Sequence, residues 1–204
     1  MRPDSKQGVF SSLQFIAIMV TLAATGMLLN PDLLKFYSGK PDLLISEFLT
    51  ENRTHLQDVD GDFSDWIELY NASEETVSLT GYYLTDDFKD YDKWKLPKAD
   101  LRPGEFLMIW ASGKNRTNWL DDLHTNFKLS RSGEYLALIR PNGKTVAHEY
   151  HPKYPHQKPD VSFGLTKEHF ETHRWLSKEP LRNYYYFNTP SPLKANQDGS
   201  LTAE

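Results

Sequence analysis

From residue 42 onward, the chain consists of short runs of strand-forming residues separated by turn-forming residues. Each run is rich in Val, Ile, Leu, Tyr, Phe and Trp, whereas Gly, Pro, Asn and Asp gather between the runs, as in antiparallel β-proteins. The number and spacing of the runs predict an all-β fold with the architecture of a β-sandwich. Eight strands are expected, at residues 43–48, 65–71, 77–86, 93–97, 104–110, 126–130, 134–140 and 144–150.

The run at residues 65–71, DWIELYN, alternates most clearly between two kinds of side chain. Because successive side chains of a strand point to opposite faces of the sheet, Ile67 and Leu69 share one face. Glu68 falls on the other face, between two aromatic residues. We therefore expect Ile67 in the core, and we expect replacement of Glu68 to affect stability much less than replacement of Ile67.

The segment Arg140–Lys144 reads RPNGK and joins two of the expected strands. Asn142 and Gly143 tolerate the positive φ angles that a tight turn between antiparallel strands requires. The pattern predicts a β-hairpin at this point of the chain.

An uncharged and mostly apolar segment occupies residues 9–29. As a helix rising about 1.5 Å per residue, it would cover about 30 Å, the thickness of the hydrocarbon core of a bilayer. Arg2 and Lys6 precede it, and positive residues favour the cytoplasmic side of a membrane. The pattern favours a transmembrane helix, with residues 1–8 in the cytoplasm, residues 30–41 as a linker and the remaining chain exported.

Two alternatives stay open for this apolar segment. It could be a cleaved signal peptide, with Ala24-Thr25-Gly26 as the small-residue cleavage site, and the protein would then be secreted. It could also be a buried helix of a soluble protein. The apolar run continues straight through the cleavage site, which favours the uncleaved anchor.

Composition excludes several classes of site. The chain has no cysteine, so it contains no disulfide, no thiolate metal ligand and no cysteine nucleophile. Its formal net charge of −5 argues against a general affinity for nucleic acid, because phosphates attract clustered Lys and Arg. We expect no nucleic-acid partner.

Four motifs follow one another in a specific order: WIELYN at 66–71, GYYLTD at 81–86, LRPGEFLMIWA at 101–111 and YLALIRPNGK at 135–144. In this order they resemble the lamin-tail domain of exported bacterial proteins. The resemblance covers Leu43 to Gly164 and implies an immunoglobulin-like β-sandwich without catalytic activity. YFNTPSPLKAN, residues 186–196, resembles the closing segment that often follows such domains. We expect a lamin-tail-like sandwich at residues 42–164 and a C-terminal extension at residues 165–204.

The acidic segment DVDGDFSDWIELYN, residues 58–71, spaces oxygen-bearing side chains as a calcium loop does, and Ca²⁺ prefers six to eight oxygen ligands. It departs from the EF-hand pattern, since Phe63 replaces the required glycine and Leu69 replaces the required glutamate. The alternative is a turn in which Asp60-Gly61 reverses the chain, Asp62 or Ser64 caps the backbone and Asp65 begins the strand. Both interpretations stay open, and the candidate metal ligands are Asp58, Asp60, Asp62 and Ser64.

Motifs of common enzyme classes are absent from the sequence, which has no phosphate-binding loop before Gly113-Lys114 or Gly143-Lys144 and no nucleophile elbow. The alternative to a binding protein is an accessory subunit, or a hydrolase that holds a divalent ion with the carboxylates of its Asp-rich loops. These carboxylates belong to Asp60, Asp62, Asp65, Asp86 and Asp87.

Aromatic residues gather near the C-terminus, in the run Tyr184–Phe187 and at Trp175. Together with Trp119 they could form a platform for a sugar or another flat ligand. A C-terminal strand with alternate rings packed on the sandwich is the favoured interpretation.

The expected function is that of a non-catalytic module tethered to the membrane and exposed outside the cytoplasm. Loops at one end of a sandwich commonly carry the binding residues, so an envelope protein or a glycan is the expected partner. No cofactor is expected apart from Ca²⁺ at the acidic segment.

Overall fold

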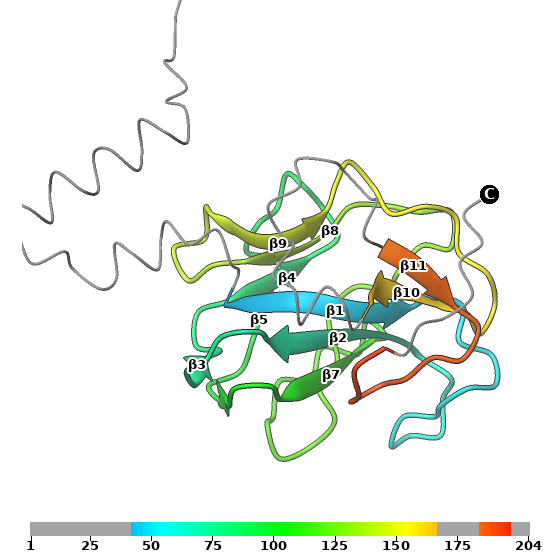
Figure 1. Ribbon diagram of the computed structural model, residues 1–204, viewed down its shortest axis with the longest axis horizontal. Helices are drawn as coiled ribbons and strands as arrows, with labels where there is room; N and C mark the ends of the chain where they lie inside the picture. Colours follow the sequence, from blue (N-terminus) through cyan, green and yellow to red (C-terminus); the bar gives the residue numbers. More distant parts are fainter. Residues whose placement is uncertain (1–41, 167–183, 197–204) are drawn as a thin grey trace, which may run out of the picture. The chain divides into compact units, whose positions relative to one another are not determined.

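The computed structural model describes residues 42–166 and 184–196, which belong to one compact unit (Figure 1). The predicted transmembrane segment at residues 9–29, the linker at residues 30–41 and Trp175 lie outside the described residues. Among the residues that are described, no helix is long and apolar enough to cross a membrane.

Five antiparallel strands form the larger sheet, in the spatial order β11-β10-β1-β2-β7 (Figure 1). The last two strands of the chain thus lie beside the first one. The strands of this sheet are β1 (Leu43–Leu49), β2 (Asp65–Asn71), β7 (Phe106–Ala111), β10 (Ser162–Leu165) and β11 (Tyr184–Phe187).

A second antiparallel sheet has four strands, in the order β5-β4-β8-β9, and a small sheet pairs β3 with β6. The four strands are β4 (Tyr83–Thr85), β5 (Trp94–Lys95), β8 (Leu136–Ile139) and β9 (Val146–Tyr150). The small sheet consists of β3 (Val77–Ser78) and β6 (Asp100–Leu101).

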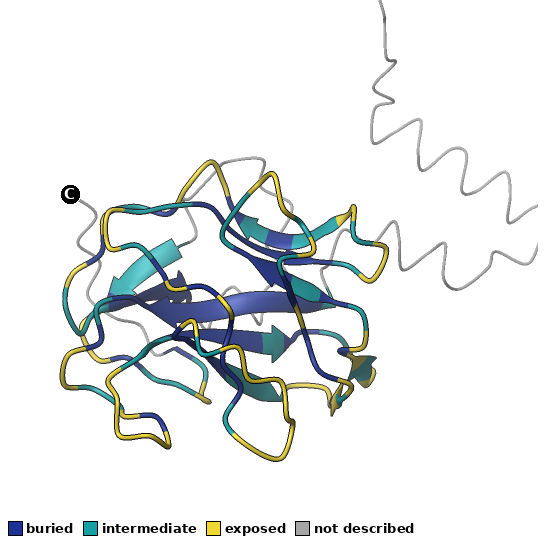
Figure 2. Cartoon of the chain, turned by 180° about the vertical axis from the view of Figure 1, so that it is seen from behind, coloured by how far each residue is buried: buried dark blue, intermediate teal, exposed yellow. Residues whose placement is uncertain are grey.

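The two larger sheets share one hydrophobic core. The rings of Phe48 on β1 and Tyr150 on β9 meet edge to face, with their centroids 5.0 Å apart. The hydroxyl of Tyr150 donates to the carbonyl of Ile45 at 3.2 Å, which links the sheets directly. β1, β2, β8 and β10 consist mostly of buried residues, whereas β7, β9 and β11 also carry half-buried ones and most exposed residues lie in the loops (Figure 2). This all-β, antiparallel architecture is consistent with the expected immunoglobulin-like sandwich.

The alternation of β2 is confirmed for its inner face, because Ile67 and Leu69 are 0% exposed and belong to the shared core. The opposite face of the five-stranded sheet, which carries Trp66 and Glu68, is called the outer face below. Glu68 is also 0% exposed, although it lies on the outer face. Its replacement therefore removes buried contacts, and the smaller effect expected for it stays a prediction. The sequence pattern shows which face a residue is on, but it does not show that the outer face is covered as well as the inner one.

A β-bulge in β1 decides which residues of that strand reach the core. The pairing with β2 shifts between Ile45 and Glu47, so Ser46 is an extra residue in the ladder. Without this residue, simple alternation would place Glu47 in the core and Phe48 on the outer face. With it, Phe48 packs in the core and Glu47 lies on the outer face.

Several expected strands have different bounds. Residues 77–86 divide into β3 and β4, because a turn at Gly81, with φ of 87°, interrupts the run. Residues 126–130 form no strand and make one isolated bridge, between Lys128 and Ser112. The expected hairpin joins β8 and β9, but of Asn142 and Gly143 only the glycine has a positive φ, 65°.

Candidate functional site

Asp58 organises the acidic segment as a turn. Its Oδ1 atom accepts the backbone N–H groups of Asp60 and Asp62, both at 3.0 Å, and its Oδ2 atom accepts the hydroxyl of Ser64 at 2.9 Å. The backbone N–H of Gly61 donates to the carbonyl of Asp58 at 2.9 Å, and Gly61 has φ of 83°. The geometry is that of a capped turn, but the cap is Asp58 and not Asp62 or Ser64 as expected.

Lys114 places an ammonium group among the acidic side chains. Its Nζ atom lies 2.6 Å from Asp58 Oδ2, 2.6 Å from Asp60 Oδ2 and 2.9 Å from Asp62 Oδ2. Arg116 adds a second cation, 2.8 Å from Asp60 Oδ2. The predicted metal ligands do come together, but a lysine occupies the position between their carboxylates. A metal ion there would first have to displace Lys114.

Charge and burial fix the protonation of this cluster. Burial alone would raise the pKa of Asp58, but the hydrogen bond from Lys114 and the bonds within the turn outweigh it and lower that pKa. Hydrogen bonds from Lys114 and then Arg116 lower the pKa of Asp60. Burial acts to lower the pKa of Lys114, and its three carboxylate partners raise it above its ordinary value. All three groups are therefore charged at neutral pH.

His124 lies beside this cluster and is 0% exposed. Its Nδ1 atom is 2.8 Å from the hydroxyl of Ser112, and its ring stacks on Trp110 with the centroids 6.5 Å apart. Burial, followed by the nearby cations, lowers the pKa of His124, so the ring is neutral. One ligand atom each from Asp58, Asp60 and His124 lies within 4.8 Å of the others, the nearest approach to a metal site in the part of the chain that the structure describes.

The carboxylates that were candidates for a divalent-ion site of a hydrolase bind different residues in different parts of the fold. Asp65 is half-buried and its Oδ1 accepts the backbone N–H of Asn52 at 3.3 Å, and burial raises its pKa to about 6. Asp86 pairs with Lys93 at 2.5 Å. Within the described residues, neither Asp65 nor Asp86 lies close enough to Asp58 and Asp60 to share a metal ion with them.

Most of the exposed apolar side chains lie in two adjoining loops, residues 50–64 and 112–124. Six large hydrophobic side chains are exposed in the described part of the chain, and four of them lie in these loops. The four are Val59 (73% exposed), Phe63 (42%), Trp119 (41%) and Leu120 (88%). We call them, with the two loops that carry them, the loop surface.

The two loops are joined by direct hydrogen bonds as well as by Lys114. The backbone N–H of Val59 donates to Asp122 Oδ2 at 2.9 Å, and the same oxygen accepts Nε1 of Trp110 at 3.1 Å. Asp122 thereby connects both loops to β7. Hydrogen bonds and ion pairs therefore hold the two loops in place, while the four apolar side chains of the loop surface are exposed to solvent.

The aromatic platform, the less favoured alternative, is not assembled from the described residues. Tyr184 and Tyr186 of β11 pack against the shared core, as alternation along a strand predicts. Trp119 belongs to the loop surface. Sequence reasoning also missed Lys114 and Arg116, which are more than 50 positions from the acidic residues they bind. No local spacing signals such a long-range pair.

Comparison with known proteins connects this fold to a family. No curated protein matches the chain. The profile of the Lamin Tail Domain family matches residues 37–152, a segment that includes both loops of the loop surface. β10, β11 and the segment after them lie beyond the match, although they complete the five-stranded sheet. Because the match spans more than half of its 204 residues, the chain belongs to the lamin tail domain family.

Proposed function

We propose that the protein is a non-catalytic binding module that recognises another protein through its loop surface. Lamin tail domains are immunoglobulin-like domains without catalytic activity, which supports a role in binding. The observation that carries the proposal is the concentration of exposed apolar side chains on two loops that are tied to each other.

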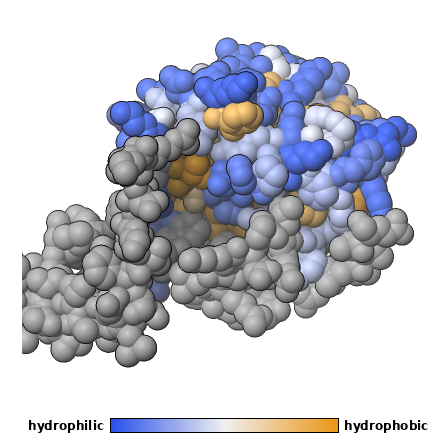
Figure 3. All heavy atoms as spheres, turned by 90° about the horizontal axis from the view of Figure 1, so that it is seen from above, coloured by the Kyte–Doolittle hydropathy of each residue, from blue (hydrophilic) through white to orange (hydrophobic). Residues whose placement is uncertain are grey.

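Exposed apolar side chains that gather on one surface typically mark a protein interface. Trp119 is the kind of large side chain that dominates binding energy when a partner covers it, and Leu120 beside it adds exposed apolar area. On the part of the surface visible in Figure 3, apolar residues form small patches between hydrophilic ones. Because Asp58 and Asp122 hold the loops in place, little conformational entropy is lost on binding.

A partner with an apolar contact surface fits better than a polyanion. The cations beside the loop surface, Lys114 and Arg116, are already paired with carboxylates. They are therefore not free to neutralise phosphates. An apolar centre with charged residues around it is the usual composition of a protein interface.

The proposal includes a location outside the cytoplasmic membrane, with residues 9–29 as the tether and an envelope protein as partner. What supports this part is the length of the apolar segment and the position of Arg2 and Lys6 before it. High-salt or alkaline washing of membranes tests it, because an apolar helix of about 30 Å stays in the bilayer when charged contacts at the surface are screened or broken. A soluble, N-terminally shortened product would contradict the tether.

Binding is tested by cross-linking the full-length protein to envelope proteins, with and without substitutions in the loop surface. We expect Val59→Ser/Leu120→Ser to reduce recovery of the specific cross-linked protein at least about tenfold, the effect of losing about 1.4 kcal/mol of binding energy. Phe88→Ser is the matched control, since Phe88 is 63% exposed and lies between β4 and β5. Equal recovery with all three proteins would refute the proposal. Loss of recovery after removal of glycans would identify a glycan as the ligand instead.

A further inference from the structure

Two glutamates lie side by side on the outer face of the five-stranded sheet. Glu47 of β1 and Glu68 of β2 are directly opposed in the strand pairing, and both are 0% exposed. The bulge at Ser46 is what brings Glu47 to this face. Buried carboxyl groups are costly unless they are neutral or fully paired, so the pair needs an explanation.

The segment that follows β11, residues 188–196, provides part of the cover and is called the closing segment. The backbone N–H of Ser191 donates to Glu47 Oε1 at 3.3 Å, and its hydroxyl oxygen lies 3.4 Å from Oε2. The backbone N–H of Leu193 donates to Glu68 Oε2 at 2.5 Å. Each glutamate therefore holds one residue of the closing segment. In Figure 1 the closing segment, in red, turns back from β11 towards β2.

The far end of the closing segment is fixed as well. Nδ2 of Asn196 donates to the carbonyl of Leu165 at 2.8 Å, and its Oδ1 accepts the hydroxyl of Ser191 at 2.7 Å. Asn196 is 1% exposed. These contacts make the segment a defined structural element that crosses the outer face.

The other groups that face the two carboxyls are neutral. The hydroxyl of Ser46 donates to Glu68, and the hydroxyl of Ser162 donates to Glu47. The other two neutral groups are the hydroxyl of Tyr150 on β9 and the side chain of Met108, the β7 residue paired with Glu68. Lys194, in the closing segment, is exposed. Within residues 42–166 and 184–196, no Lys, Arg or His forms a hydrogen bond or ion pair with either glutamate.

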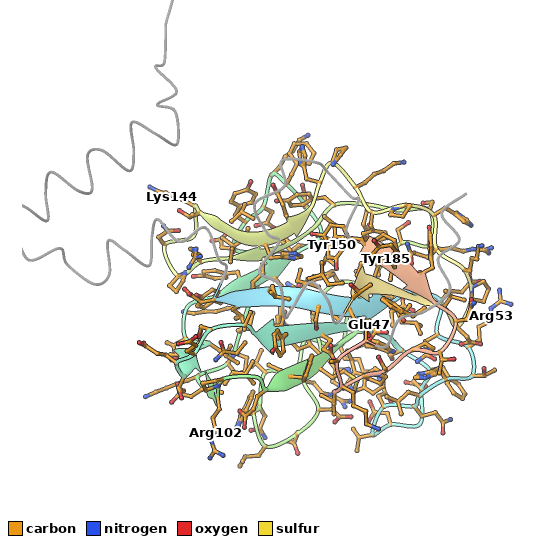
Figure 4. The ribbon with its side chains drawn as sticks, in the orientation of Figure 1. Glu47, Arg53, Arg102, Lys144, Tyr150 and Tyr185 are labelled. Atoms are coloured by element: carbon orange, nitrogen blue, oxygen red, sulfur yellow. The ribbon has the colours of Figure 1, made fainter. Side chains whose placement is uncertain are left out.

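Figure 4 agrees with this distribution of charge, since Glu47 lies near the middle of the molecule and Arg53, Arg102 and Lys144 lie at its edges. With no cation from the described residues bonded to it, burial raises the pKa of Glu47 to about 7. Burial, together with the charge of Glu47, raises the pKa of Glu68 to about 8.

We propose that the closing segment is a pH-dependent clasp, which is docked on the outer face while Glu47 and Glu68 hold their protons and is released when they ionise. The docked segment keeps water away from both carboxyls, and release would hydrate them. Ionisation is therefore easier in the released state. This device uses other residues than the loop surface does and does not depend on the proposed binding function.

The direction of the effect follows from proton linkage. A carboxyl with a raised pKa in the docked state stabilises docking fully below its ordinary pKa of 4.5, and this stabilisation is lost as the pH rises through 7 and 8. For each carboxyl, the population of the released state can grow by up to about tenfold per pH unit between the ordinary pKa of 4.5 and the pKa in the docked state, about 7 for Glu47 and about 8 for Glu68. Docking is thus favoured in mildly acidic surroundings.

Amide hydrogen exchange of the full-length protein between pH 6 and pH 9 tests the clasp. We expect the protection of the Ser191 and Leu193 amides, corrected for the intrinsic exchange rate, to fall at least about tenfold over this range. The control amide is that of Arg140, which donates to the Thr145 carbonyl at 2.8 Å beyond the end of β8. Its protection should change less than about twofold.

The variant Glu47→Gln/Glu68→Gln keeps the size of both side chains but does not ionise, so its closing segment should stay protected up to pH 9. The single variant Glu68→Gln should retain part of the pH dependence of protection. It replaces the double variant in the test if the double variant folds poorly. The proposal is overturned if the wild-type amides keep their protection, if the variants lose it as the wild type does, or if the Arg140 amide loses it to the same extent.

Discussion

The Nζ atom of Lys114 lies 2.6 Å from Oδ2 of Asp58, although 56 positions separate the two residues in the chain. The carboxylate is also the centre of the turn that precedes β2, because it accepts two backbone N–H groups. Lys114 thus does from within the chain what a bound cation would do, since it balances the negative charge of an acidic loop. A calcium ion would have to compete with a covalently tethered ammonium group.

This relationship leads to a prediction about calcium. Millimolar Ca²⁺ should raise the melting temperature of the protein by no more than about one or two degrees, since a ligand stabilises only by RT ln(1 + [L]/Kd) and binding here must displace Lys114. Thermal unfolding with Ca²⁺ and with a chelator measures the effect. A rise of about ten degrees that disappears in Asp60→Asn/Asp62→Asn would show that the acidic segment is a structural metal site.

Lys114→Met should destabilise the protein by about 1.5–3 kcal/mol, the usual range for hydrogen bonds to charged groups. The substitution leaves the Asp58 side chain, which is 0% exposed, without its cation. Urea unfolding measures the change. Lys144→Met is the control, because Lys144 is exposed in the turn between β8 and β9, and it should change the stability by less than about 0.5 kcal/mol. Equal losses would mean that the Lys114 ion pairs contribute nothing.

Local patterns in the sequence were sufficient for the strands with strong alternation. Residues 65–71 match β2 at both ends, and the runs at 43–48 and 144–150 match β1 and β9 closely. The run at 126–130 has a strand-like composition but makes one isolated bridge and no strand, so tertiary context overrides propensity. Composition shows that a run can form a strand, and the neighbouring chain decides whether it does.

The parts that sequence reasoning missed all depend on contacts between distant positions. Leu193 binds Glu68 across 125 positions and Ser191 binds Glu47 across 144. The acidic segment was recognised as a candidate site, but the residue that fills it, Lys114, gave no local signal. The bulge at Ser46 is likewise visible only through its pairing with β2. Hydrophobic periodicity describes one strand at a time, and it does not show which distant segments pack over that strand.

Burial on both faces of β2 leads to a prediction about side-chain truncation. Ile67→Ala should cost about 2–5 kcal/mol, because it leaves a cavity in the shared core. Glu68→Ala should cost about 1–3 kcal/mol, because the hydroxyl of Ser46 and the N–H of Leu193 lose their acceptor. Urea unfolding measures both. Glu74→Ala, at an exposed position, should stay within about 0.5 kcal/mol, and a Glu68→Ala variant as stable as this control would mean that the outer face is open.

Because the imidazole of His148 is buried, we expect the folded state to lose stability in acid. Its side chain lies on β9, its Nε2 is 3.0 Å from the hydroxyl of Tyr184, and burial lowers its pKa from 6.5 to about 4. A lowered pKa in the folded state means that the stabilisation is complete above pH 6.5 and is lost as the pH falls towards 4. The loss attributable to His148 should reach about 3 kcal/mol, since one pKa unit corresponds to about 1.4 kcal/mol.

The measurement is the free energy of unfolding between pH 7 and pH 4 for the wild type and for His148→Gln, which cannot be protonated in this range. The difference between the two curves isolates His148 from carboxyl groups that titrate in the same window. His151→Gln is the control at an exposed position just beyond β9. Parallel curves for the wild type and His148→Gln would show that the buried imidazole does not control the acid response.

Gly164 of β10 is paired with Glu47 at the bulge of β1, and the two strands approach each other closely there. A Cβ atom on Gly164 would lie 2.2 Å from the carbonyl oxygen of Ser46 and 2.7 Å from the Cα of Glu47. Backbone atoms cannot move aside as a side chain can, so Gly164→Ala should cost about 3 kcal/mol or more, the upper end for overpacking.

The control for Gly164→Ala is Gly104→Ala, measured by urea unfolding under the same conditions. Gly104 has φ of 75° but no atom within 4 Å of a Cβ at its position, so its substitution introduces backbone strain without a clash. That strain alone should cost about 1–2 kcal/mol. If Gly164→Ala is no more destabilising than Gly104→Ala, β10 does not approach the bulge this closely. The position of Glu47 beneath the closing segment would then need another cause.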